Sequence, residues 1–241
     1  MSQANINAAF IIIGDEILSG RTQDVNLNFL AKNLAEIGIN LREVRVVPDI
    51  EEEIISAVNL LRKKFSYVFT SGGIGPTHDD ITTESVAKAF GDIYQKNQEA
   101  AEILLKYYGE GNVNEARMKM AFLPKSASLL DNPVSSAPGF RIENVFVMAG
   151  VPKIFQAMFA AAKKELVGGK ITKMLEIRTF LTESKIAKDF ADLQKKYVQI
   201  SMGSYPFEGG TSLVFRGSDY KALEDSRNEM AEILEKINPQ I

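Results

Sequence analysis

Short apolar runs alternate with amphipathic stretches along the first two thirds of the chain, and this alternation constrains the fold more than any other feature. The run AAFIIIG (8–14) is typical of a buried strand in a parallel sheet, and apolar residues at 27, 30, 34 and 37 then recur with the period of a helix. The same pair of patterns repeats in residues 41–65 and 66–91. Strands that alternate with helices require right-handed crossovers, so the sequence predicts the α/β class, with a mostly parallel sheet covered on both faces.

Beyond these repeats the pattern is less regular. Residues 93–130 predict helices and loops without a clear strand. Residues 141–150, RIENVFVMAG, predict one further strand, and the next helix is expected to begin at Pro152, because proline suits the first helical turn.

A pair of glycines, Gly168 and Gly169, interrupts the periodicity and predicts a boundary between domains 1–168 and 169–241. The second stretch predicts a small domain with the element order βαββα. Its last helix is expected to bury Leu223, Met230, Ile233 and Ile237. A core of this size is marginal by itself, so we expect this domain to serve in dimerisation or in closure of the site and to carry no metal ligand.

The composition excludes several classes of function. The 241 residues include no Cys and one His, His78, so disulfides, cysteine nucleophiles and sites with several histidines are excluded, and any metal would need oxygen ligands. A formal charge of −3 leaves no basic field for a nucleic-acid partner. The longest apolar runs have six residues, against roughly 20 for a membrane-spanning helix, and the start MSQANIN lacks the charged segment of a signal peptide. We therefore expect a cytoplasmic protein with a small-molecule ligand and neither a nucleic-acid nor a membrane partner.

Three turns follow predicted strands, at the edge of the sheet where open α/β folds bind ligands. The first carries Asp15 and Glu16, the second is the segment 70–84, and the third carries Gly150 and Lys153. Each also has a structural interpretation, because an Asp can cap a helix, glycines form turns and a lysine can be simply solvated.

The second turn, TSGGIGPTHDDITTE (70–84), matches no standard phosphate loop. A P-loop would place Lys and Ser or Thr after its last glycine, but Pro76 and Thr77 follow Gly75. A dinucleotide fingerprint would require a third glycine at the position of His78. The features that remain are flexible glycines at a strand end and a helix N-terminus, which together suit an anion.

Two adjacent carboxylates, Asp79 and Asp80, follow these glycines. One of them could cap the next helix. A carboxylate next to a bound phosphate is repelled unless a divalent cation bridges the two, and Mg²⁺ is typically held by one or two carboxylates together with substrate phosphates. The sequence therefore predicts a metal-bound phosphate or pyrophosphate as the ligand.

Four segments in this order, GDEILSGRTQDVN, TSGGIGPTHDDITTESVAKAFG, NPVSSAPGF and AGVPKIF, resemble the successive motifs of the MoaB/Mog molybdopterin-binding family. They are similar to the version of this fold found at the N-terminus of competence/damage-inducible protein A (CinA). The resemblance covers roughly residues 8–165, and SMGSYP in the tail is similar to the small middle domain of the same family. It implies a three-layer α/β domain followed by a small α/β domain, and a homo-oligomer.

The resemblance also implies roles for individual residues. Asp15 and Asp80 would be the functional acids that hold a divalent cation (Mg²⁺, Mn²⁺ or Co²⁺), and Asp79 would be a second ligand or a base. It leaves a monovalent cation open as a further cofactor. Contacts with the phosphates or the nucleotide are implied for Ser71, Gly72, Gly73, Gly75, Thr77, Asn26, Gly150 and Lys153.

The departures from the family pattern leave three functions open. The first is metal-dependent hydrolysis of a pyrophosphate bond in a nucleotide such as ADP-ribose or FAD. The second is molybdopterin binding or adenylyl transfer in molybdenum-cofactor synthesis, although adenylylating relatives carry Arg where this chain has Asp79. The third is a binding protein without turnover. The deamidase domain of full-length CinA proteins has no counterpart in this sequence, so deamidation is not expected.

Overall fold

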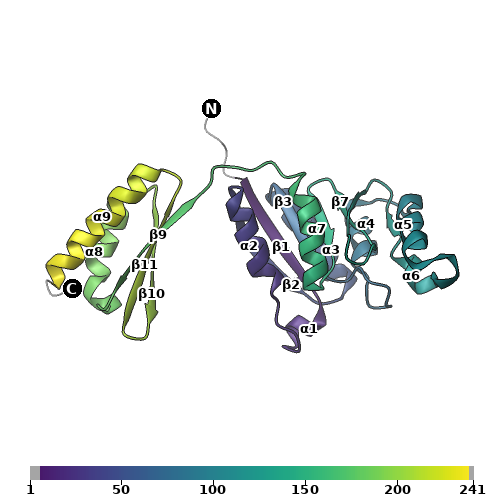
Figure 1. The fold of residues 1–241 in the computed structure, drawn as a ribbon, viewed down its shortest axis with the longest axis horizontal. Helices are drawn as coiled ribbons and strands as arrows, with labels where there is room; N and C mark the ends of the chain where they lie inside the picture. The colour runs from purple at the N-terminus through teal and green to yellow at the C-terminus, as the bar shows by residue number, and fades with distance from the viewer. Residues whose placement is uncertain (1–5, 239–241) are drawn as a thin grey trace. The chain divides into compact units, whose positions relative to one another are not determined.

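A computed structural model describes residues 6–238 of the chain, the side chain of Glu110 excepted. These residues divide into a first unit that ends at Gly169 and a second unit that begins at Lys170 (Figure 1). Across residues 6–238, no helix has the length and the apolar character that crossing a membrane requires.

The first unit is built around a six-stranded sheet with the order β2-β1-β3-β8-β7-β6. Its strands are β1 (Ile6–Ile13), β2 (Ile39–Val47), β3 (Tyr67–Ser71), β6 (Ser128–Leu130), β7 (Gly139–Ile142) and β8 (Val145–Met148). The four strands from β2 to β8 are parallel, whereas β7 and β6 are added antiparallel. The predicted α/β class with a mostly parallel sheet is confirmed.

Helices cover both faces of this sheet. Successive residues of strand β1 point to opposite faces, and all of its apolar residues from Ala8 to Ile13 are buried, so each face must pack against helices. Ala8, Phe10 and Ile12 pack into one cluster with residues of α2 and α7, whereas Ala9, Ile11 and Ile13 pack into another with residues of α3, α4 and α5. The helices of this unit are α1 (Asp15–Leu18), α2 (Asn26–Glu36), α3 (Glu51–Lys64), α4 (Thr82–Phe90), α5 (Gln98–Tyr108), η1 (Glu110–Asn112), α6 (Glu115–Lys119) and α7 (Pro152–Lys163). The sheet is therefore the middle of three layers.

The prediction that residues 93–130 contain no strand is wrong. Besides β6, the segment holds β4 (Tyr94–Lys96) and β5 (Phe122–Pro124), which pair antiparallel with each other. Each of these strands has three residues, too few to show an alternation, and their pairing brings together positions that lie far apart in the sequence.

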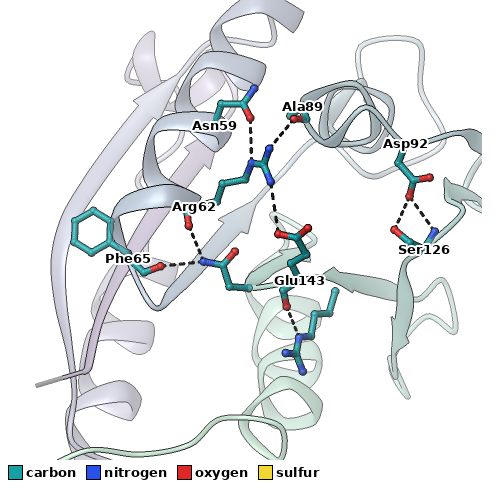
Figure 2. Close-up of polar contacts among 9 residues, drawn as sticks. Asn59, Arg62, Phe65, Ala89, Asp92, Ser126 and Glu143 are labelled. Carbon is teal, nitrogen blue, oxygen red and sulfur yellow. Dashed lines mark hydrogen bonds and ion pairs between the residues drawn. The ribbon is translucent and has the colours of Figure 1, made fainter. Parts of the chain in front are cut away.

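The single strand predicted for residues 141–150 is also wrong, because the chain turns back at Glu143 and Asn144 and forms the hairpin β7–β8. Glu143 has a left-handed backbone, with φ 49°. Figure 2 shows the contacts that hold this turn: the Arg62 guanidinium lies 3.6 Å from the Glu143 carboxylate and donates to the carbonyl of Ala89. The amide of Asn144 donates to the carbonyls of Arg62 and Phe65, each at 2.9 Å. The amino ends of β3 and β8 are thereby tied to α3.

The second unit has the predicted order βαββα, with β9 (Lys173–Thr179), α8 (Glu183–Lys196), β10 (Ser201–Phe207), β11 (Gly210–Gly217) and α9 (Tyr220–Ile237). Its antiparallel sheet has the order β10-β11-β9. Leu223 and Met230 of α9 are fully buried, as predicted, and Ile233 is partly buried. Ile237, by contrast, is exposed and Leu234 is buried in its place, because the buried stripe follows the true period of 3.6 residues.

Candidate functional site

The carboxyl ends of β1, β3 and β8 lie side by side and carry the turns singled out in the sequence. The N–H of Gly72, directly after β3, donates to the carbonyl of Met148 at the end of β8 at 3.1 Å. The N–H of Gly14, directly after β1, donates to Val47 of β2 at 3.2 Å. The sheet therefore brings the three turns together at one edge, as the parallel topology requires.

Two glycines after β3 are required by the fold itself. Gly72 and Gly73 have φ values of +109° and +69°, which L side chains rarely adopt. A Cβ atom at Gly72 would lie 2.1 Å from the carbonyl oxygen of Ile13, and one at Gly73 would lie 2.1 Å from the hydroxyl oxygen of Thr82. The glycines thus allow the turn to lie directly against the end of β1 and the start of α4.

A hollow of about 390 Å³ opens at this edge. One part of its wall is polar and includes the glycine turn, Asp80 and Glu16, and another part is apolar and includes Tyr108, Met120 and Met158. The full lining comprises Glu16, Gly72, Gly73, Ile74, Gly75, Pro76, Asp80, Tyr108, Met120, Asn132, Ser135, Ala137, Ala149, Gly150, Val151, Ile154 and Met158. Its volume falls within the range of small-molecule sites, roughly 300–1,000 Å³.

Asp80 is held in the wall of this hollow by Thr77. The carboxylate oxygen Oδ2 accepts hydrogen bonds from the backbone N–H of Thr77 at 2.9 Å and from its hydroxyl at 2.5 Å. A Cβ atom at Gly75 would lie 2.6 Å from the same oxygen, so the glycine makes room for the carboxylate. Asp80 therefore has a fixed position next to the glycine turn. Both hydrogen bonds from Thr77 go to Oδ2, and neither goes to the other carboxylate oxygen, Oδ1.

Asn26, the first residue of α2, joins the ends of two strands. Its side chain is 3% exposed, and its amide donates to the Ser71 hydroxyl at 2.9 Å and to the Gly150 carbonyl at 2.8 Å. Within residues 6–238, its Oδ1 atom has no hydrogen-bond partner. Asn26, Ser71, Gly150 and Glu16 line a second, smaller hollow of about 60 Å³. Gly150 and Glu16 line both hollows.

Acidic groups gather at this edge of the sheet. Burial raises the pKa of Asp49, and the backbone N–H of Asp15, which donates to its carboxylate at 3.1 Å, acts against that rise. The negative charges of Asp15, Glu16 and Asp79 raise the pKa of Asp49 further. Asp15, Glu16, Asp49 and Asp79 thus lie close enough to influence one another, and a group of like charges favours a cation between them.

The structure brings together most, but not all, of the predicted site residues. Asp80, Gly72, Gly73, Gly75 and Gly150 line the larger hollow, and Asn26, Ser71 and Gly150 line the smaller one. Asp15, Asp79, Thr77 and Lys153 line neither hollow and are exposed. For these four residues a direct role stays a prediction, and the N–H and the hydroxyl of Thr77 both donate to Asp80.

Three residues of the hollow were not assigned a role from the sequence. Glu16 lies next to the predicted Asp15, and the short helix α1 directs Glu16 rather than Asp15 to the hollow. Asn132 is buried, and its amide donates to Ser135 and Ala137, which holds these lining residues together. Tyr108 at the end of α5 reaches the hollow through the tertiary fold alone, and no local signal predicts it.

The donor set fits a cation that arrives with its ligand. Among the side chains of residues 6–238, no group of three or more His, Cys, Asp or Glu residues is placed to hold a metal ion by itself. Asp80 and Glu16 nevertheless line the same hollow as the glycine turn. Two carboxylates complemented by phosphate oxygens are a typical coordination of Mg²⁺ in nucleotide sites.

Comparison with known proteins gives two matches to families. Residues 9–168 match the family described as "Probable molybdopterin binding domain", and residues 173–240 match "FAD synthase, middle domain". A protein of Pyrococcus abyssi is 34% identical over 235 residues, which cover 91% of this chain and 93% of that protein.

Two further relatives differ in length from this chain. A "Probable FAD synthase" of Caenorhabditis elegans is 33% identical over 225 residues, covering 83% of this chain but 43% of that protein, so the chain spans less than half of its length. The crystal structure of the protein CinA of unknown function from Thermoplasma acidophilum is similar with a TM-score of 0.63 and 36% identity. That similarity covers 67% of this chain and 99% of the other.

Proposed function

Because the chain belongs to the family of the probable molybdopterin binding domain, we propose that it binds a nucleotide by its diphosphate group and hydrolyses the pyrophosphate bond with the help of a divalent cation. The observation that carries this proposal is the larger hollow, where the glycine turn and the carboxylates of Asp80 and Glu16 share one space. A turn of this kind, with the first residue of helix α4, Thr82, hydrogen-bonded to Gly73, suits the negative charge of a diphosphate.

The two carboxylates need a positive charge between themselves and the diphosphate. Asp80 and Glu16 would hold the divalent cation, Mg²⁺, Mn²⁺ or Co²⁺, and that cation would supply Lewis-acid stabilisation of the phosphoryl oxygens. In the reaction, the oxygen of one water molecule bonds to one phosphorus atom while the bond from that phosphorus to the bridging oxygen breaks. Two monophosphates are released, and the protons of the water pass to the product and to solvent.

The residues of the chain would contribute mainly by position. Thr77 fixes the carboxylate of Asp80 through two hydrogen bonds, and Asn26 ties Ser71 to Gly150 at the ends of β3 and β8. Groups that are held in place before the substrate arrives need no reorganisation during the reaction, which lowers the barrier.

The apolar wall suits the flat ring of a nucleotide. Tyr108, Met120, Ile154 and Met158 line the same hollow as the two carboxylates, and Asn132 and Ser135 add polar groups to its lining. An aromatic ring and two thioether side chains are favourable neighbours for a planar ring. The relatives named as FAD synthases point to FAD as a substrate. ADP-ribose is the alternative substrate, because it contains the same central diphosphate.

The test incubates the full chain with FAD or ADP-ribose in Mg²⁺, Mn²⁺ or Co²⁺, with EDTA as the metal-free control. Liquid chromatography is expected to show AMP together with FMN, or AMP together with ribose 5-phosphate, in the presence of metal and not in EDTA. The Asp80→Asn variant is the matched control for a contaminating hydrolase. If no metal supports release of AMP from either compound, the proposed hydrolysis is refuted.

A second candidate function is binding of molybdopterin, which the description of the matching family favours. The same apolar wall and glycine turn would accept a pterin and its phosphate. Calorimetry with molybdopterin tests this function separately, and tight binding without hydrolysis of either nucleotide would support it over the first.

A further inference from the structure

Lys119, the last residue of α6, reaches the loop that follows the glycine turn. Its ammonium group donates a hydrogen bond to the carbonyl oxygen of Thr77, 42 positions earlier in the chain. The side chain is partly buried and lines a separate hollow together with Met118, Tyr94 and Phe122. The lysine thus lies beside apolar groups while its charge extends to the loop.

Thr77 is the only contact point between this lysine and Asp80 that the described hydrogen bonds show. Its carbonyl accepts from Lys119, while its N–H and its hydroxyl both donate to the carboxylate of Asp80. The N–H of Asp80 in turn donates to the carbonyl of Thr77 at 3.3 Å, which closes a tight turn. A change at the carbonyl of Thr77 is therefore transmitted to the carboxylate of Asp80 through one residue.

Apart from the bond from Lys119, the loop is held by hydrogen bonds within itself, between Thr77 and Asp80 and from the N–H of Ile81 to the carbonyl of Asp79. Pro76, Thr77, His78 and Asp79 are all exposed, and exposed loops with few buried contacts open locally at low cost in free energy. A hydrogen bond from a charged donor is about twice as strong as one between neutral groups. The bond from Lys119 is thus a major restraint on this segment.

We propose that Lys119 is a positioning residue that fixes the Thr77–Asp80 turn and so holds the Asp80 carboxylate at the larger hollow. The consequence for turnover rests on the proposed function, whereas the restraint on the turn does not. In this arrangement a residue of α6 restrains the loop after the glycine turn, although the two segments are far apart in the sequence.

The test of the restraint is amide hydrogen exchange of the full chain, which requires neither metal nor substrate. Lys119→Met keeps most of the apolar stem and removes the charge, whereas Lys119→Arg keeps a charged donor. Lys106→Met, at an exposed lysine of α5, is the matched control for loss of one positive charge. We expect the Thr77 amide to exchange at least tenfold faster in Lys119→Met, and within twofold of the parent in the Arg variant and the control. If Lys119→Met is unstable, Lys119→Gln provides the same comparison.

An unchanged exchange rate of the Thr77 amide in a folded Lys119→Met protein would overturn the proposal. The second measurement is hydrolysis of FAD. We expect kcat to fall at least tenfold in Lys119→Met, with KM within twofold of the parent, and Lys119→Arg to recover to within threefold. A faster exchange with unchanged kcat would refute the positioning role. If the parent protein hydrolyses neither nucleotide, it is the proposed function that fails, and the exchange rates still decide the restraint.

Discussion

Replacing Asn26 with alanine tests whether the strand ends at the site are tied together as the structure shows. The change removes two hydrogen bonds, to Ser71 at 2.9 Å and to Gly150 at 2.8 Å, each worth about 1 kcal/mol of net stability. It also removes the Oδ1 atom, which is buried without a partner within residues 6–238, and this returns about 0.5–1 kcal/mol, the low end of the penalty for a buried polar group. The free energy of unfolding should therefore fall by about 1–1.5 kcal/mol, which lowers Tm by about 2–6 °C in a domain of this size.

Calorimetric unfolding of the full chain measures this difference. Asn33→Ala is the control on the same helix, because the Asn33 side chain donates to the carbonyl of Phe29 at 3.0 Å within α2 and accepts a long bond from Lys163 at 3.5 Å, so it joins no strand ends. We expect the control to lower Tm by less than half as much as Asn26→Ala. If the two variants have the same Tm within about 1 °C, Asn26 does not join the two strand ends in solution and the description of the smaller hollow is wrong.

Three further changes test other parts of the site. Asp80→Asn keeps an oxygen that can accept from Thr77 but loses the charge that a hard cation needs, so FAD hydrolysis should fall at least about 100-fold while Tm stays within about 2 °C; an unchanged rate at saturating metal would remove Asp80 from the mechanism. Gly73→Val places a Cβ atom 2.1 Å from the Thr82 hydroxyl at φ +69°, so we expect a loss of at least about 2 kcal/mol in denaturant unfolding, and parent-like stability would contradict this close approach. Asp49→Asn should raise Tm by about 1–2 °C at pH 7, because burial and neighbouring acids raise the pKa of Asp49 in the folded state. Unfolding of the parent becomes easier as pH rises from the pKa of Asp49 in the unfolded state through its raised pKa in the folded state. The difference in Tm between the two proteins should therefore vanish at pH values below both of these pKa values. A difference in Tm that stays constant with pH would refute the assignment.

Sequence patterns were sufficient for the class of the fold and for the position of the site along the chain. The buried strand β1 and the amphipathic helices α2 and α3 are local signals, because a strand and a helix each repeat their apolar residues with a fixed period. The topology of a parallel sheet then places the residues after β1, β3 and β8 at one edge. For this reason the sequence could predict that the glycine turn and Asp80 lie at this edge, where they line the larger hollow.

The hairpin β7–β8, the three-residue strands β4 and β5 and the apolar wall with Tyr108 could not be predicted in this way. Each depends on contacts between distant segments: Tyr94 pairs with Pro124, and Arg62 holds the turn at Glu143. Such contacts leave no period in the sequence, because their strength depends on the partner and not on the neighbours along the chain.

The tertiary structure also decided which acid faces the hollow. Asp15 and Glu16 are adjacent, and both carry the charge that a cation site needs, but the first turn of α1 rotates successive side chains by about 100°. Glu16 therefore lines the hollow, whereas Asp15 does not, and the backbone N–H of Asp15 donates to the Asp49 carboxylate. The sequence determined that acids lie after β1, and the direction of a short helix determined which of them lines the hollow.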